Sequence, residues 1–265
     1  MATINEQQQA KALRLLAEEL DIPESYYDKA KARYESLGAW LERDESTLAS
    51  LGPRIYAQGS FRYGTVKPAK RAFDLDLVAE FTALSKQEQT QAWVKDALGK
   101  EIKAYAEAHS MKAEPEPTKR CWNLEYAEEG GLEFHMDILP AVPEDETVKA
   151  LLAGSVPHEL AELAIAFTDE TDPAFRLISS EWPMSNPRGF ARWFESRMRG
   201  AARQLLLERV EELPPHRWNT PLQKVVRILK DHRDTMFEHD PDHKPVSVII
   251  TTLAGQAYEG QTDLQ

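Results

Sequence analysis

A pair of aspartates inside an apolar run constrains this chain more than any other feature. Asp74 and Asp76 lie two residues apart in FDLDLVAEF (73–81), which alternates as a strand does. Side chains two apart in a strand point to one face of the sheet, where two carboxylates repel each other and are costly to bury unpaired. A divalent cation resolves both problems, because Mg²⁺ binds hard oxygen ligands such as carboxylates and phosphates. Two solvated acids on an edge strand would give the same pair, so the surrounding sequence has to decide.

A small-residue turn and a third acid supply that context. Gly59-Ser60 ends the strand-like segment RIYAQGS, and such a turn lets backbone N–H groups and a serine hydroxyl face a phosphate. Asp137 lies in FHMDILP, which predicts a strand that can pair beside the first. Three carboxylates on neighbouring strands are what a two-metal phosphoryl transfer needs. We expect Asp74 and Asp76 to bridge two ions. Asp137 would hold the second ion and activate a ribose hydroxyl, by lowering its pKa or acting as its base.

The rest of the chain predicts a mixture of helices and strands. Helices are expected over residues 5–20, 24–48, 85–109, 188–212, 219–237 and 246–258. Residues 118–127 and 132–142 flank Glu-Glu-Gly-Gly, which predicts a hairpin. Several prolines in 141–186 indicate a loop-rich bridge. We therefore expect a catalytic lobe over residues 1–186, a helical lobe over residues 187–265, and a cleft between them.

Together, Gly59-Ser60, Asp74-Leu75-Asp76 and Asp137 resemble the polymerase-beta nucleotidyltransferase superfamily. More closely, QGSFRYGTVKP, FDLDLV and HMDILPAV resemble the bacterial cGAS/DncV-like nucleotidyltransferases (CD-NTases), which make cyclic oligonucleotide second messengers in CBASS anti-phage defence. The resemblance covers most of the chain. It implies an α+β fold, with a polymerase-beta-like lobe built on a mixed sheet, a helical C-terminal lobe and a long N-terminal spine helix.

The resemblance also implies further site residues. Taken alone, Lys230 would be a surface lysine beside the core face of its helix, and Ser247 a helix-start serine. By likeness to the family, both contact the triphosphate of a nucleotide, as does the Gly59-Ser60 turn. Lys224 is a weaker candidate. The implied substrates are ATP and other NTPs, and the implied cofactors are two Mg²⁺ ions, with Mn²⁺ as a substitute.

Four arginines gather on one side of the predicted helix over 188–212. Arg188, Arg192, Arg199 and Arg203 fall within about 60° on a wheel turning 100° per residue. A solvated basic face would give this stripe, and so would a surface that binds a nucleic acid activator or an acidic partner. Because some clades of the family are switched on by HORMA partners, with or without DNA, such a partner stays open. The net charge of −12 argues against a chain whose main task is to coat nucleic acid.

The compartment follows from three further features. The longest apolar runs, such as VSVIITTLA, are far shorter than the ~20 residues of a membrane span. The polar N-terminus MATINEQQQAKALRLLAEEL does not resemble a signal peptide. The single cysteine, Cys121, excludes an internal disulfide. We expect a cytoplasmic protein that does not enter a membrane.

These features predict a metal-dependent nucleotidyltransferase that condenses NTPs, ATP among them, into a cyclic di- or trinucleotide with release of pyrophosphate. Two alternatives stay open. One is a linear oligoadenylate synthase or an enzyme that modifies RNA or protein. The other is a catalytically silent nucleotide-binding or interaction protein, against which the three intact acids count. The sequence does not place the cleft residues that choose the base.

Overall fold

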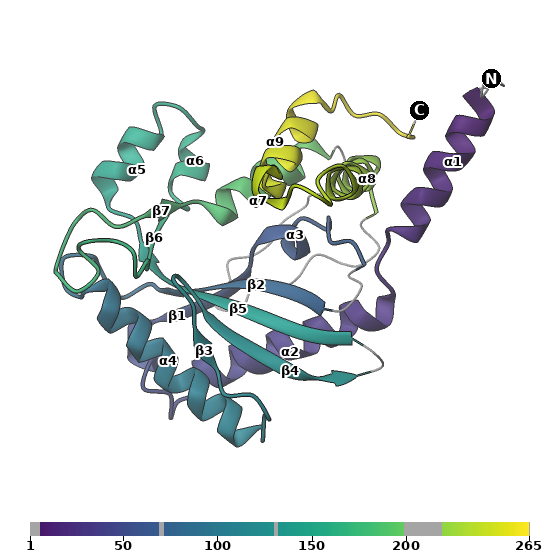
Figure 1. Cartoon of the computed structure of the whole chain (residues 1–265). Helices are drawn as coiled ribbons and strands as arrows, with labels where there is room; N and C mark the ends of the chain where they lie inside the picture. The colour runs from purple at the N-terminus through teal and green to yellow at the C-terminus, as the bar shows by residue number, and fades with distance from the viewer. Residues whose placement is uncertain (1–5, 69–71, 130–131, 199–218, 265) are drawn as a thin grey trace.

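The computed structural model describes residues 6–68, 72–129, 132–198 and 219–264. Its centre is a mixed β-sheet with helices on both sides (Figure 1). The strands are β1 (Pro53–Ala57), β2 (Ala72–Phe81), β3 (Glu116–Pro117), β4 (Trp122–Glu129), β5 (Leu132–Pro143), β6 (Ile165–Phe167) and β7 (Met184–Ser185). They run in the order β1-β2-β5-β4-β3, and β6 pairs with both β5 and β7.

The helices and short 3₁₀ turns fill the intervals between the strands. They are α1 (Glu6–Glu19), α2 (Glu24–Glu42), η1 (Ala49–Leu51), α3 (Gly59–Arg62), α4 (Gln91–Ala108), α5 (Glu146–Leu152), α6 (His158–Ala161), α7 (Pro187–Arg197), α8 (Pro221–Met236), η2 (Pro241–His243) and α9 (Ser247–Ala257). No helix in the described ranges combines the length and the apolar character that crossing a membrane requires.

The pairing of β2 with β5 is the parallel element of the sheet, and β1·β2 and β4·β5 are antiparallel. A parallel pair needs a long crossover, which α4 supplies between the two strands. The side chain of Thr90 caps this helix by accepting from the backbone N–H of Trp93 at 3.1 Å. The expected hairpin is present as β4 and β5. The strand carrying Asp137 therefore lies directly beside the strand carrying the aspartate pair.

The main hydrophobic core lies on one face of the sheet, where α2 and α4 cover it (Figure 1). Phe73, Leu75 and Leu77 of β2 are buried in this core, together with Leu37 of α2 and Leu98 of α4. Fully burying a side chain of this kind contributes about 1.5–3 kcal/mol. Because a strand alternates, burying the odd-numbered positions directs the even-numbered positions, and with them both aspartates, to the opposite face.

Helices α7, α8 and α9 lie beyond that opposite face (Figure 1). They share a smaller core in which Phe194, Met198, Leu222 and Val226 are buried. Helix α8 begins with a capping box between Thr220 and Gln223. The N-terminal helix α1 contacts α8, so the first helix packs with the C-terminal ones. The expected division at residue 187 stays a prediction.

Several predicted elements differ from the structure at their ends. Helix α2 stops at Glu42 rather than at residue 48. The next residue, Arg43, has extended backbone, and its side chain pairs with Glu101 at 2.9 Å. Helix α4 starts at Gln91 rather than at residue 85. The bridge expected to be loop-rich contains α5 and α6, and its β6 extends the sheet from β5. The described part of the helix expected over 188–212 ends at Arg197, and residues 199–218 lie outside the described ranges.

Candidate active site

Asp74, Asp76 and Asp137 lie on two adjacent strands, at positions that face away from the main core. Asp76 of β2 and Asp137 of β5 are direct register partners, and Asp74 is the partner of His135. Burial first, and then the negative charges of Asp137 and Asp74, raise the pKa of Asp76 to about 6. Burial also raises the pKa of Asp74, with the charge of His135 opposing and that of Asp137 adding to the effect. The sheet thus places three acidic side chains close enough for their charges to act on one another.

The Gly-Ser turn lies against these carboxylates. After β1, the backbone N–H of Gln58 donates to the carbonyl of Asp76 at 2.8 Å, which holds the turn beside β2. Gly59 adopts φ +63°, a left-handed conformation that favours glycine, and an oxygen of Asp76 occupies the space that a side chain at Gly59 would need. Ser60 follows in the short helix α3. Backbone and carboxylate are therefore in contact where the sequence predicts a phosphate site.

Lys230 and Ser247 reach the same place from the helical side. The Nζ of Lys230 donates to the carbonyl and hydroxyl oxygens of Thr65, at 3.1 and 3.3 Å. The lysine is only 5% exposed, so the interpretation of it as a surface residue is wrong. Burial first, and then the positive charges of Arg233 and Lys67, lower the pKa of Lys230 to about 8, against the opposing charges of Asp234 and Asp76. The hydroxyl of Ser247, at the start of α9, accepts from Arg233 at 3.0 Å.

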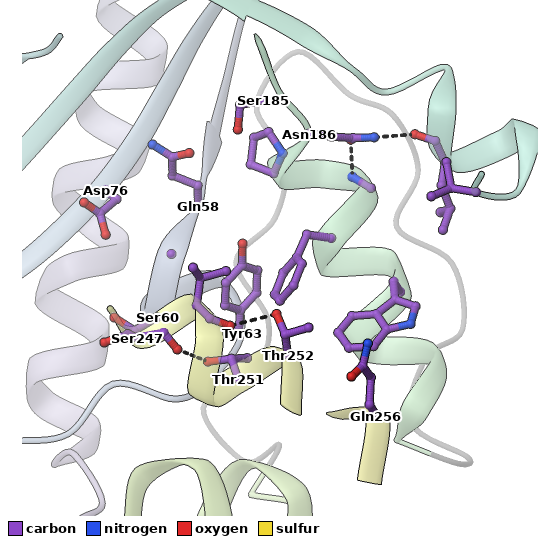
Figure 2. A pocket seen from close by; sticks show the side chains of 18 of the residues that line it. Gln58, Ser60, Tyr63, Asp76, Ser185, Asn186, Ser247, Thr251, Thr252 and Gln256 are labelled. Atoms are coloured by element: carbon purple, nitrogen blue, oxygen red, sulfur yellow. Dashed lines mark hydrogen bonds between the residues drawn. The ribbon is translucent and has the colours of Figure 1, made fainter. Parts of the chain in front are cut away.

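One cavity of about 850 Å³ brings the two sides together. Figure 2 shows Asp76 and Gln58 on the sheet side of this cavity, with Ser247 and Thr251 of α9 across from them. Lys230 lines it as well. Asp76, the Gly59-Ser60 turn, Lys230 and Ser247 thus line one hollow, whereas Asp74 and Asp137 are not among its lining residues. Lys224 lines neither this cavity nor the smaller one beside it.

A second hollow of about 220 Å³ adjoins the first and shares Ser60, Lys230 and Ser247 with it. Two cations that the sequence did not single out, Lys67 and Arg233, line this hollow. Lys67 pairs with Asp231 at 2.8 Å and with Asp234 at 2.6 Å. Lys67 lies in the segment QGSFRYGTVKP, but nothing in its spacing marks it as a site residue. Lys67, Lys230 and Arg233 thus bring positive charge to this hollow, and Asp231 and Asp234 balance part of it.

Aromatic rings form the far wall of the larger cavity. The rings of Tyr63 and Phe190 have their centroids 5.0 Å apart, and those of Phe190 and Trp193 are 5.2 Å apart. Gln256 lines the same cavity (Figure 2). A flat apolar base can stack on such a wall, with amide groups nearby for its polar edge. Sequence patterning assigns Phe190 to a helix core face and gives no sign of this wall.

The donors present suit a hard divalent cation. Asp76 and Asp137 offer oxygen ligands on adjacent strands. The pKa of Asp76 is raised first by burial and then by neighbouring negative charge, which a cation would neutralise. Their side-chain conformations do not by themselves form a cluster: within the described residues, no three His, Cys, Asp or Glu side chains are grouped around one point. Burial raises the pKa of the nearby Cys121 to about 12, which keeps the thiol neutral and makes it a poor ligand.

The arginine stripe is not a solvated surface at its first position. Arg188 is buried, lies 3.5 Å from Glu80 and stacks over the ring of Tyr56 at 5.3 Å. The prediction that Arg188 faces solvent or a nucleic acid is therefore wrong, because the start of α7 packs on β1 and β2. Arg192 is half-buried, and Arg199 and Arg203 lie outside the described residues. The described part of the stripe does not support a nucleic acid activator.

Fold and site together give a mixed sheet with two register-paired aspartates beside a Gly-Ser turn and with helices over that face. Residues 53–140 match the family model described as the nucleotidyltransferase domain of cyclic GMP-AMP synthase DncV-like proteins. The matched range contains the Gly-Ser turn and all three aspartates.

Two curated relatives cover nearly the whole chain. A c-di-GMP synthase of Roseivirga ehrenbergii is 28% identical over 259 residues, which are 95% of this chain and 61% of the relative. The cyclic dinucleotide synthase CdnG of Bradyrhizobium diazoefficiens is 26% identical over 266 aligned residues, covering 91% of this chain and 57% of the relative. The chain thus spans about three fifths of the length of these relatives.

Solved CD-NTase structures share the fold. The Bradyrhizobium diazoefficiens CdnG complex with GTP gives a TM-score of 0.65 at 21% identity, over 95% of this chain and 70% of that one. The Escherichia coli MS115-1 CdnC:HORMA-deltaN complex gives 0.62 at 15% identity, over 97% of this chain and 66% of that one. The expected α+β fold is confirmed by these likenesses.

Proposed function

We propose that this chain is the catalytic part of a cyclic dinucleotide synthase, which joins two NTPs and releases pyrophosphate. One observation carries the proposal: Asp76 lines a cavity together with Ser60, Lys230 and Ser247, and its register partner on the adjacent strand is Asp137. A nucleotidyl transfer needs negative ligands for cations at the reacting phosphate and positive or N–H groups for the rest of the triphosphate. The names of both curated relatives agree with it.

Each group has a role that its position suits. Ser60, Lys230 and Ser247 would bind the triphosphate, with the Lys230 ammonium aligning the leaving pyrophosphate. Asp74, Asp76 and Asp137 would hold two Mg²⁺ ions, or Mn²⁺ in their place, which stabilise charge on the transferring phosphate. Asp137 would take the proton of the attacking ribose hydroxyl. Most of the rate gain would come from alignment and from fixed charges in a site that excludes water.

Guanine nucleotides are our first choice of substrate. One relative is named a c-di-GMP synthase, and CdnG was solved with GTP. The sequence favours ATP among the NTPs, and that prediction remains untested. Tyr63 and Phe190 can stack either purine, since stacking does not distinguish the two bases. The second nucleotide and the linkage therefore need product analysis.

Regulation and setting extend the same proposal. CdnC was solved as a complex with HORMA-deltaN, and a HORMA-type partner for this chain rests on resemblance to that family. A role in anti-phage signalling has the same basis. The cytoplasmic location predicted from the sequence stays a prediction.

Incubation with all four NTPs and either Mg²⁺ or Mn²⁺, followed by mass spectrometry, tests the proposal. A cyclic dinucleotide with pyrophosphate release is expected, and Asp76→Asn should abolish both. Asp96→Asn, which changes an exposed aspartate of α4, is the matched control. Linear oligoadenylates would support the first alternative. A protein that binds NTPs but releases no pyrophosphate with either metal would support a silent nucleotide-binding protein.

A further inference from the structure

The amide side chain of Asn123 contacts the third aspartate from the neighbouring strand. Asn123 of β4 is the register partner of Asp137 of β5, on the side of β5 away from Asp76. Its Nδ2 donates to Oδ1 of Asp137 at 2.9 Å. An ionised carboxylate only accepts hydrogen bonds, so the amide must turn its N–H group toward it. Asp76, Asp137 and Asn123 thus form a row across three adjacent strands.

We propose that Asn123 is a positioning residue for Asp137, holding its carboxylate in the orientation that metal binding requires. The inference rests on the proposed function. A carboxylate turns easily about its last side-chain torsion, because that torsion has broad minima. A donor fixed to Oδ1 removes this freedom and leaves Oδ2 available to a cation.

An amide is suited to this task in a way that a cationic side chain is not. Lysine or arginine at position 123 would neutralise Asp137 and repel a metal ion. Asn123 carries no charge at any pH, so it orients the carboxylate and leaves its negative charge in place. The other two aspartates have different neighbours: Asp76 lies against Gly59, and Asp74 lies 3.6 Å from His135.

The backbone under Asn123 is well anchored. The residues on either side, Trp122 and Leu124, are buried on the opposite face of the sheet. The indole N–H of Trp122 donates to the carbonyl of Lys95 at 2.9 Å, and the ring fills the space beside Gly99. A donor on a fixed strand holds its partner more accurately than one on a loop. The geometry is therefore that of a support for Asp137.

Mn²⁺ binding to the nucleotide-free protein, measured by electron paramagnetic resonance, tests this role without turnover. Asn123→Leu keeps the approximate size and loses the donor, and we expect Mn²⁺ to bind roughly 10–100-fold more weakly. Asn123→Gln keeps an amide and should recover part of the loss. Glu125→Gln is the control, because Glu125 is an exposed residue two positions along the same strand. It should bind Mn²⁺ as the wild type does.

The kinetic pattern gives a second readout. Asn123→Leu should lower kcat at limiting Mg²⁺, recover with added Mg²⁺, and leave KM for the NTP nearly unchanged. Asn123→Ala tests the same point if the leucine variant does not fold. Wild-type Mn²⁺ affinity in a folded variant would overturn the inference and leave the proposed function intact. If the wild-type protein and Asp137→Asn bind Mn²⁺ equally poorly, both the inference and the proposed metal site fail.

Discussion

A Cβ atom placed on Gly59 would overlap Oδ2 of Asp76, closer than real Cβ atoms approach their neighbours. The turn that is proposed to bind phosphate therefore packs directly against the carboxylate that is proposed to bind metal. This close packing is possible because residue 59 has no side chain. Any side chain at position 59 would push the carboxylate aside or open the turn. Nucleotide and metal sites are thus geometrically dependent on each other.

Gly59→Ala is expected to lower activity at least about 100-fold, because a displacement of one ångström at a reacting centre has that effect. The φ of +63° also makes alanine strained, with about 1 kcal/mol lost from the free energy of unfolding. Gly52→Ala is a matched control, since Gly52 has φ +61° and an equally close oxygen, on Thr82. It should lose similar stability in urea unfolding and keep its activity. Equal activity losses in both variants would contradict the argument.

Removal of the charge of Asp76 should stabilise the metal-free protein above pH 6. The pKa of Asp76 is raised to about 6, so the folded state holds this proton more tightly than the unfolded state. The contribution of Asp76 to the free energy of unfolding therefore falls as pH rises from about 4 to 6, and it stays low above pH 6. Asp76→Asn has no carboxylate to ionise, so its free energy of unfolding at neutral pH should be roughly 1–3 kcal/mol higher than that of the wild type.

In the presence of Mg²⁺, the wild type should be more stable than Asp76→Asn, which is the reverse of the order without metal. It is expected to raise the Tm of the wild type above pH 6, where Asp76 is ionised, and to have little effect below it. Asp76→Asn should lose most of this gain, and Asp96→Asn should keep it. Thermal denaturation on both sides of pH 6, with and without Mg²⁺, provides the measurement. A gain of the same size in Asp76→Asn would show that Mg²⁺ binds elsewhere.

Triphosphate binding should take up a proton through Lys230. Its pKa is lowered to about 8, so part of the population is neutral at mildly alkaline pH, and a bound polyanion favours the ammonium form. Calorimetry in two buffers of different ionisation enthalpy should detect this uptake above pH 8, and affinity should fall as pH rises further. Lys230→Met should abolish the uptake. Lys224→Met, one and a half turns earlier on α8, should leave it unchanged.

The carboxylate face was predictable from the sequence because alternation in a strand links residue identity to direction. Because Phe73, Leu75 and Leu77 are buried in the main core, Asp74 and Asp76 must point to the opposite face of the sheet. The strand pattern around Asp137 likewise predicted a neighbour for β2, but not its register. Register depends on the crossover through α4 and on packing along the whole strand.

The positions of isolated cations could not be predicted in the same way. A helical wheel places Arg188 on a basic side, yet its partner Glu80 lies 108 residues earlier in the chain and is buried. The burial of Lys230 could not be predicted either. Only the family resemblance implied that it binds nucleotide, and only its contact with Thr65 shows that it is covered. Periodicity reports which side of a helix is apolar. It does not report which polar residues another element will cover.

The last prediction concerns the attachment of the helical side to the Gly-Ser turn. Arg62 of α3 and Glu195 of α7 form an ion pair, with side chains only 6% and 12% exposed. Arg62→Met leaves Glu195 buried without its partner and should cost about 3–5 kcal/mol in urea unfolding. The double variant Arg62→Met/Glu195→Leu should recover most of that loss. Lys31→Met serves as the control, because Lys31 pairs with Glu35 at an exposed site and its loss should cost under about 0.5 kcal/mol. If the double variant were as unstable as Arg62→Met, the charge of Glu195 would not be the cause, and the contact would stabilise the protein through packing alone.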